Sequence, residues 1–183
     1  MTFKTDALRT IINKEGGAAT NNRYIVFLPT LTGTVKPDGT TAKDPVIVAD
    51  LNQLCTSARI PGKNINIVER QIGLDQLKVA NGYTFGEVSL TFYLTNAYGA
   101  KKYFQEWSEC ITSPTPPYNI GFHNNYAKSV FIEQQDKVGG LIYRAELLNA
   151  YPTTFTEIEL NNQAQTAALE FTVSLTFSNY LIR

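Results

Sequence analysis

The chain has 183 residues, a length typical of one compact domain, and 43% of them are hydrophobic, which is enough to build a buried core. Lysine and arginine together number 16, as do aspartate and glutamate, so the chain carries no basic excess with which to bind phosphates tightly. No apolar run reaches the ~20 residues needed to cross a bilayer, and the N-terminal sequence lacks the apolar core of a secretion signal. These properties predict a soluble protein made in the cytoplasm, with neither a membrane span nor tight DNA binding.

The first segment predicts one short amphipathic helix over residues 5–15, with Thr5 as its cap and Gly16-Gly17 as its stop. Its apolar residues recur at helical spacing: Leu8, Ile11 and Ile12. Helices this short are marginal alone in water, so the apolar face must dock against the domain or against another subunit. We therefore predict an N-terminal arm over residues 1–21 and a single domain over residues 22–183.

The next segments alternate between strand-forming runs and turns. Residues 23–28 are dense in β-branched and aromatic residues and end at Pro29, which predicts a strand. Residues 30–45 are rich in glycine, proline, aspartate and threonine, which predicts an exposed and mobile loop. Further strands are predicted over residues 46–60 and 65–68.

The clearest pattern is a strict alternation of apolar and polar residues in two segments, 84–94 and 169–177. A period of two places one set on each face of a strand, so each strand has one dry and one wet face. The dry set predicts the core: Val88, Leu90, Phe92, Phe171, Val173 and Leu175. The wet set predicts a solvated face: Glu87, Ser89, Thr91, Glu170, Thr172, Ser174 and Thr176.

Between these two strands lies the main predicted helix, whose core side includes Phe104 and Trp107. Its apolar residues follow the helical period: Ala100, Tyr103, Phe104, Trp107 and Ile111. We expect Asn96 to cap the helix and Lys102 to pair with Glu106 one turn later. The prolines at 114–117 end it.

Strands are also predicted around residues 127–134 and 141–150, joined by a hairpin turn at 136–140. Tyr151-Pro152 is expected to break the chain before a last stretch at 155–160. About eight strands and one long helix predict a mainly β fold of two antiparallel sheets packed face to face. The expected architecture is an antiparallel β-sandwich or barrel with one flanking α-helix and the short N-terminal helix.

The sequence offers no catalytic constellation. The single histidine, His123, lies in a polar stretch, and Cys55 and Cys110 are too far apart for a zinc or redox motif. The nearest carboxylate pair, Glu157 and Glu159 on one predicted strand face, lacks the loop of a metal site. We therefore predict no enzyme activity, no metal and no cofactor.

Several stretches, taken in order, resemble the tail-tube proteins of contractile-tailed bacteriophages. They are LCTSARIPG at 54–62, GYTFGEVSLTF at 82–92, the helix with Tyr103-Phe104 and Trp107, YPTTFTEI at 151–158 and EFTVSLTF at 170–177. The resemblance covers residues 22–180 and implies a β-sandwich subunit with a flanking helix. It also implies homohexameric rings, closed by joining sheets between neighbours and stacked into a conduit for DNA inside a contractile sheath.

The resemblance also implies roles for the surface residues. The wet-face residues become candidate lumen positions, and a polar lumen without a basic lining would let DNA pass without gripping it. The arm and the loop at 30–45 become candidate inter-ring contacts through Leu8, Ile11, Ile12, Lys36, Asp38 and Lys43. An ordinary solvated face, a flexible insertion and a frayed terminus remain the alternatives. The expected partners are copies of the chain and the sheath, baseplate and tail-terminator proteins, in a phage tail assembled in the host cytoplasm.

Four other functions stay open at this point. Within the same class, the chain could form a baseplate ring that initiates the tube, or the tube of a related injection machine. From another class, a monomeric β-sandwich could bind carbohydrate through Tyr83, Tyr93 or Tyr118. An enzyme would need a pocket that joins His123 to carboxylates.

Overall fold

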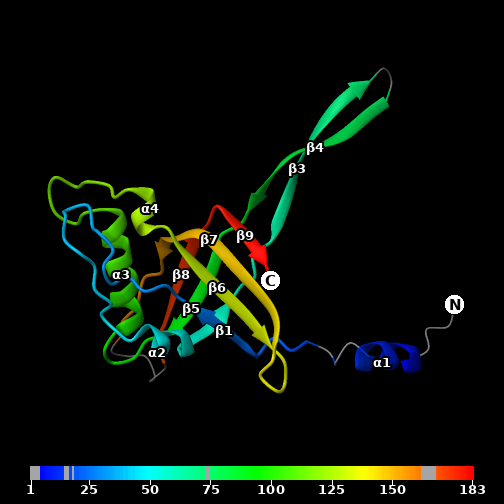
Figure 1. Ribbon diagram of the computed structural model, residues 1–183, viewed down its shortest axis with the longest axis horizontal. Coiled ribbons are helices and arrows are strands. Elements are labelled where there is room, and N and C mark those ends of the chain that lie inside the picture. Colours follow the sequence, from blue (N-terminus) through cyan, green and yellow to red (C-terminus); the bar gives the residue numbers. More distant parts are fainter. Residues whose placement is uncertain (1–4, 15–16, 18, 73–74, 162–167) are drawn as a thin grey trace.

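A computed structural model describes residues 5–14, 17, 19–72, 75–161 and 168–183, and its fold is mainly β with antiparallel pairing, as predicted. Figure 1 shows a sheet body with α3 at one side, a long hairpin that projects from the body, and α1 apart from the sheets. In chain order the elements are α1 (Thr5–Lys14), β1 (Tyr24–Phe27), α2 (Val48–Gln53), β2 (Cys55–Ala58), β3 (Lys63–Ile72), β4 (Asp75–Phe85), β5 (Val88–Tyr93), α3 (Gly99–Ile111), α4 (His123–Tyr126), β6 (Lys128–Gln135), β7 (Leu141–Phe155), β8 (Glu170–Thr176) and β9 (Asn179–Ile182). The division into arm and domain stays a prediction.

One sheet folds into two layers because β7 belongs to both of them. The strand order is β1-β6-β7-β8-β5-β2, with β9 also paired to β7. The first part of β7 pairs with β6 and β9, whereas the part from Tyr151 onward pairs with β8. At the change between partners, Asn149 adopts a φ of 54°, which asparagine tolerates better than most residues. The bend in β7 thus turns a single sheet into a sandwich-like fold.

The core lies between the two layers and α3, and it contains every predicted core residue. The six alternating residues of β5 and β8 are at most 2% exposed, and Phe104 and Trp107 are fully buried. The ring of Phe104 lies 5.4 Å from that of Phe92, and the indole nitrogen of Trp107 donates to the Tyr126 carbonyl at 2.8 Å. Burial of each such side chain contributes about 1.5–3 kcal/mol, so α3 is fixed to the sheet by its aromatic face.

Two expectations about the main helix are wrong, although the helix itself is confirmed. Asn96 does not cap it; the capping position is Tyr98, whose φ is 54° and whose side chain makes no capping hydrogen bond. Glu106 pairs with Lys36 at 2.8 Å rather than with Lys102. Glu106 pairs with Lys36 because this ion pair is partly buried, whereas a pair with Lys102 would lie on the helix surface in contact with water.

The strand predicted over residues 46–60 is only partly correct, because α2 precedes the short β2. Leu51 in α2 is buried, and the side-chain oxygen of Asn52 accepts the backbone N–H of Leu28 at 3.0 Å. This short helix therefore packs on the end of β1. Residues 48–53 therefore form a helix, packed through Leu51, in place of the first part of the predicted strand.

The structure also corrects the strand boundaries near the two ends of the core. The predicted strand at 84–94 is two strands, β4 and β5, separated at residues 86–87. Pro152 does not break the chain, because β7 continues through it to Phe155. A register shift follows Pro152 in the β7–β8 pairing, and proline is tolerated at such bulges because it has no N–H to donate. Residues 156–161 form no strand, and β9 was not predicted.

Candidate assembly surfaces

The predicted wet residues share one face of the sheet. Ser89 pairs with Ser174 and Thr91 with Thr172, and the last two hydroxyl oxygens lie 3.0 Å apart. The face extends sideways because the hydroxyl-bearing Ser57 of β2 and Thr154 of β7 pair with this row. The remaining predicted residues on or beside the same strands are Glu87, Glu170 and Thr176. The outcome is a surface made mainly of hydroxyl groups, which we call the hydroxyl face.

Charge on the hydroxyl face is confined to its two ends. Glu87 lies just before β5, and Glu170 begins β8, which runs antiparallel to β5. The two glutamates therefore lie at opposite ends of the face. The strands β5 and β8 contain no lysine or arginine. These two strands therefore offer no basic side chains to phosphate groups.

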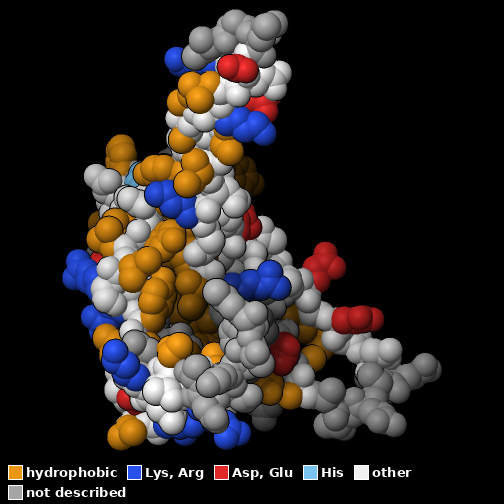
Figure 2. All heavy atoms as spheres, turned by 90° about the vertical axis from the view of Figure 1, so that its right-hand side faces the viewer, with side chains coloured by type: hydrophobic (Ala, Val, Ile, Leu, Met, Phe, Trp, Pro, Cys, Tyr) orange, Lys and Arg blue, Asp and Glu red, His pale blue; other side chains and the backbone are white. Residues whose placement is uncertain are grey.

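The β3–β4 hairpin is the most unusual surface of the chain. The short strand predicted at 65–68 lies within β3, but the full length of β3 and its pairing with β4 were not predicted. Its two strands pair along nearly their whole length and form a sheet of their own. Ile65 and Ile67 on one face are 62% and 60% exposed, and Val68 and Leu77 on the other face are 40% and 50% exposed. Figure 2 shows hydrophobic side chains along the projection that continue over the body beneath it. Apolar side chains are thus exposed on both faces of the hairpin.

An aromatic cluster fixes the base of this hairpin to the body. The ring of Phe85, at the end of β4, lies 5.1 Å from Tyr83, 5.3 Å from Phe177 and 5.3 Å from Tyr180. The ammonium group of Lys63 lies 4.2 Å from the centre of the Tyr83 ring. Phe177 and Tyr180 belong to the corner between β8 and β9, so the hairpin leaves the body from a rigid base.

The loop at 30–45 is ordered against α3, which corrects the expectation that it is exposed and mobile. Leu31 and Ala42 are buried in the core, and Val35 forms a β-bridge with Thr41. Lys36 lies between two carboxylates of α3, 2.8 Å from Glu106 and 2.9 Å from Glu109. Burial alone would lower the pKa of Lys36, but its hydrogen bonds to these two carboxylates raise it above its ordinary value.

The proposed inter-ring residues of this loop are therefore not equivalent. The ammonium group of Lys36 is engaged within the chain, whereas Asp38 and Lys43 are exposed. Hydrogen bonds from the hydroxyl and backbone of Thr40 lower the pKa of Asp38, so it is ionised at neutral pH. The inter-ring role of all three residues stays a prediction.

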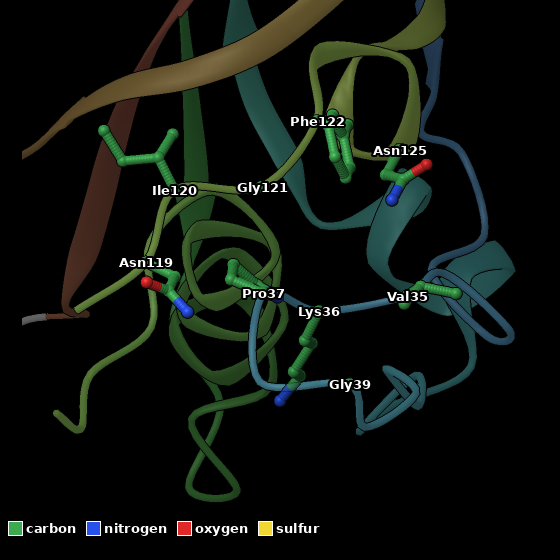
Figure 3. A pocket seen from close by; sticks show the side chains of 9 residues that line it. All are labelled: Val35, Lys36, Pro37, Gly39, Asn119, Ile120, Gly121, Phe122 and Asn125. Carbon is green, nitrogen blue, oxygen red and sulfur yellow. The ribbon is translucent and has the colours of Figure 1, made fainter. Parts of the chain in front are cut away.

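A hollow of about 440 Å³ lies between this loop and the segment that follows α3. Figure 3 shows the two segments facing each other across it. Its lining residues are Val35, Lys36, Pro37, Gly39, Asn119, Ile120, Gly121, Phe122 and Asn125. Ile120 and Phe122 are 75% and 83% exposed, so the hollow has an uncovered apolar wall. We call it the loop hollow.

The N-terminal helix is confirmed as α1, and its apolar face is uncovered. Leu8 and Ile11 are 45% and 60% exposed, and Ile12 is half-buried. The backbone N–H of Gly17 donates to the Ile12 carbonyl at 2.8 Å, in agreement with the predicted stop. The predicted contributions of Thr5 as a side-chain cap and of Gly16 lie outside the described residues. The inter-ring role of α1 stays a prediction.

A comparison with known families decides the identity of the fold. The sequence profile of the family described as phage tail tube protein matches residues 19–183. The chain belongs to this family. No curated protein sequence matches it.

Solved structures share the fold of this tail tube protein. A chain of the anti-feeding prophage tube-terminating cap has 16% identity and a TM-score of 0.61, with 91% of each chain covered. A chain of the anti-feeding prophage baseplate has 12% identity and a TM-score of 0.59, covering 91% of this chain and 95% of its own. A chain of an extracellular contractile injection system, in its sheath-tube complex, has 12% identity and a TM-score of 0.55, covering 100% and 99%. These likenesses extend over nearly the whole tail tube chain.

In this tail tube protein, the residues that the sequence analysis considered for catalysis or metal binding have other surroundings. His123 stacks edge-on against the rings of Tyr126 and Tyr151. Glu157 and Glu159 follow the end of β7, and the prediction that they share one face of a strand is wrong. Among the described residues no cluster of three metal-ligating side chains occurs, and no described helix is long and apolar enough to span a membrane.

The cysteines and tyrosines of this tail tube protein occupy unrelated positions. Burial raises the pKa of the Cys55 and Cys110 thiols to about 11 in each case. Tyr83 lies on the hairpin, Tyr93 ends β5, and Tyr118 lies in the segment between α3 and α4. The three tyrosines thus belong to three different parts of the chain.

Proposed function

We propose that this tail tube family protein is a structural subunit whose copies close into homohexameric rings. The rings stack into a hollow tube that conducts DNA inside a contractile sheath, and the subunit has no enzymatic role. The observation that carries this proposal is the β3–β4 hairpin. Family membership supports it, and so does the fold shared with chains of contractile injection systems.

The hairpin requires a partner for energetic reasons. A two-stranded hairpin is marginally stable at best in water unless a further strand or another element covers its apolar surface. Strands of 10 and 11 residues extend roughly 30 Å, so most of the hairpin lies beyond the reach of the body. Its exposed isoleucine, valine and leucine side chains would gain about 25 cal/mol for each Å² that a neighbour covers. A neighbouring copy of the chain satisfies this need in every subunit of a ring.

Open strand edges support closure by sheet continuation. β1 and β2 are the outermost strands of the sheet order. The side chain of Tyr24 donates to the Cys55 carbonyl between them, but the two strands do not pair through their backbones. Exposed edges invite pairing with another strand. In a closed ring, each of these edge strands can pair with a strand of an identical neighbour, so that no edge stays unpaired.

The hydroxyl face suits the lumen of such a tube. It is polar enough to remain hydrated, and its central strands β5 and β8 carry no basic side chains that would hold a phosphate backbone. The glutamates at its two ends would repel rather than retain DNA. A conduit needs this combination of hydration and weak adhesion.

Ring formation is tested by the mass and shape of the purified chain. We expect rings in electron microscopy and a hexameric mass in sedimentation. Ile67→Asp should abolish the rings while the subunit stays folded, because Ile67 is exposed within one chain. Val138→Asp is the matched control, since Val138 is 93% exposed in the β6–β7 turn and should tolerate the charge.

The outcomes separate the competing functions. A chain that stays monomeric at high concentration, with and without sheath and baseplate partners, refutes the proposal. A chain that forms single rings and never stacks acts as an initiating or terminating ring rather than as the tube itself. Saturable glycan binding by a monomer would support the carbohydrate-binding alternative instead.

A further inference from the structure

We infer that Asn81 is a site of spontaneous modification, at which the side-chain amide is lost and the residue becomes aspartate or isoaspartate. We infer further that subunits altered in this way no longer join rings. The modification itself is a property of the single chain. Its effect on rings rests on the proposed function, because it requires the β3–β4 hairpin to contact a neighbouring copy. Asn81 and Gly82 form the only Asn-Gly pair in the sequence.

The Asn81-Gly82 pair lies at a bulge in β4 and not at the hairpin turn, the position that this dipeptide most often has in hairpins. The register of β3 with β4 shifts between Ile65 and Ile67. At this shift, Asn81 and Gly82 together oppose the single residue Asn66. Gly82 has a φ of 119°, which glycine adopts without the strain that a side chain would bring. The bulge therefore requires Gly82, whereas many other residues could precede it.

The reaction consumes nothing except water. The backbone nitrogen of Gly82 attacks the side-chain carbonyl carbon, Cγ, of Asn81 and forms a cyclic imide. The bond from Cγ to Nδ2 breaks, and this nitrogen leaves as ammonia with the proton that Gly82 loses. Water then opens the imide. Cleavage between the ring nitrogen and Cγ gives aspartate, whereas cleavage between the ring nitrogen and the backbone carbonyl carbon gives isoaspartate.

The surroundings of Asn81 leave this attack unhindered. Asn81 and Gly82 are both exposed, and within the described part of the chain the Asn81 side chain makes no hydrogen bond. Apart from its two chain neighbours, no described residue has an atom within 4 Å of the position that a Cβ of Gly82 would occupy. A two-stranded hairpin is also marginally stable, so the backbone opens readily into the geometry of the attack.

The pair Asp38-Gly39 could form the same imide, but its groups are engaged. The nitrogen of Gly39 donates to a carbonyl of its own loop at 3.0 Å. One oxygen of Asp38 accepts the backbone N–H of Thr40 at 2.9 Å and the hydroxyl of Thr40 at 2.6 Å. These hydrogen bonds lower the pKa of Asp38, and an ionised carboxylate resists attack by a nucleophile. The structure therefore favours the reaction at Asn81 over this second pair.

Both products disturb the part of the hairpin that the proposed function places against a neighbour. Each product puts a carboxylate where a neutral amide stood. Isoaspartate also lengthens the backbone of β4 by one carbon atom, because the chain then passes through the side chain. The bulge lies between the aromatic base at Phe85 and the exposed apolar residues Ile67 and Leu77, so these residues shift relative to the body. A carboxylate without a partner is costly within an apolar contact.

Peptide mapping of the free, full-length chain by mass spectrometry tests the modification. Aspartate and isoaspartate should accumulate at Asn81 in mildly alkaline buffer, at no less than about a tenth of the rate in a peptide of residues 79–84, because a marginally stable hairpin opens easily. Asn66 is the matched control within the same hairpin and should stay unchanged, since the branched side chain of Ile67 crowds the nitrogen that would attack. A slower rate at Asn81, or an equal rate at Asn66, overturns the inference.

The effect on rings is measured by letting a partly modified sample assemble and separating rings from free chains. The isoaspartate content should be roughly tenfold or more lower in the rings than in the free chains. Asn81→Gln, incubated in the same way, should assemble fully, because the longer side chain forms the imide far more slowly. Equal isoaspartate contents in the two fractions overturn the effect on rings and leave the modification standing. If the fresh Asn81→Gln chain and the fresh unmodified chain both form no rings, the proposed function fails, and the effect on rings fails with it.

Discussion

Replacement of Phe85 by alanine should release the β3–β4 hairpin without unfolding the body. Phe85 is the last residue of β4, and its ring contacts Tyr83 within the hairpin and Phe177 and Tyr180 at the β8–β9 corner. These contacts connect the hairpin with the body. Few other apolar contacts restrain the distal part, whose side chains are largely exposed.

The expected loss follows from burial and ring geometry. Truncation of a fully buried phenylalanine costs about 3–5 kcal/mol, and each aromatic pair adds about 0.5–1.5 kcal/mol beyond its buried area. Because Phe85 is only half-buried, we expect a loss of about 2–3 kcal/mol. An isolated hairpin is marginally stable, so this loss should appear as local opening rather than as global unfolding.

Amide hydrogen exchange of the unassembled subunit measures this opening. Exchange in residues 63–72 and 75–85 should accelerate by about thirtyfold or more, since 1.4 kcal/mol corresponds to a factor of ten. Exchange in β5 and β8 should stay unchanged. Phe122→Ala is the matched control, because Phe122 is 83% exposed and lies far from the hairpin base in the chain. Unchanged hairpin exchange, or an equal loss of protection in β5 and β8, would refute the reasoning.

Three further predictions concern the core, the loop and the thiols. Val173→Asp should cost at least about 4 kcal/mol and prevent folding, because it places a charge in the core. Glu170→Arg should change the free energy of unfolding by less than about 0.5 kcal/mol, as measured by urea unfolding. If Glu170→Arg instead unfolds the domain, the assignment of the two strand faces is inverted. Lys36→Met should cost about 1–2 kcal/mol in the same assay, with Lys36→Arg as control, because two carboxylates lose their shared cation. The pKa of Lys36 is raised in the fold, so this contribution is complete below about pH 10 and is lost as the pH rises further; equal stability of the methionine variant at pH 7 would contradict it. With pKa values near 11, about one thiol in a thousand is ionised at pH 8. Cys55 and Cys110 should therefore react slowly with a thiol reagent until the chain is unfolded. Rapid reaction of the folded chain would contradict the raised pKa values.

The sequence alone predicted those parts of the fold in which apolar residues recur with the period of a strand or a helix. Residues of β5 and β8 alternate strictly because one face is dry and the other wet, and this alternation assigned Val173 to the core and Thr172 to the hydroxyl face. The aromatic side of α3 follows the helical period for the same reason. Family membership also followed from ordered local stretches, since such stretches survive in sequence without knowledge of contacts.

Other features depended on contacts between distant residues. Only residues 65–68 of the hairpin were predicted as a separate strand, because the rest of β3 and β4 is exposed on both faces and shows little alternation of apolar and polar residues. The ion pair between Glu106 and Lys36 could not be predicted, because these residues are 70 positions apart in the sequence and meet only when the loop packs on α3. Likewise, Pro152 remains within β7 only because the sheet changes partners there and needs no N–H at that position. Local chemistry sets which face of each element is apolar, whereas the surfaces that join copies arise from the packing of elements far apart in the chain.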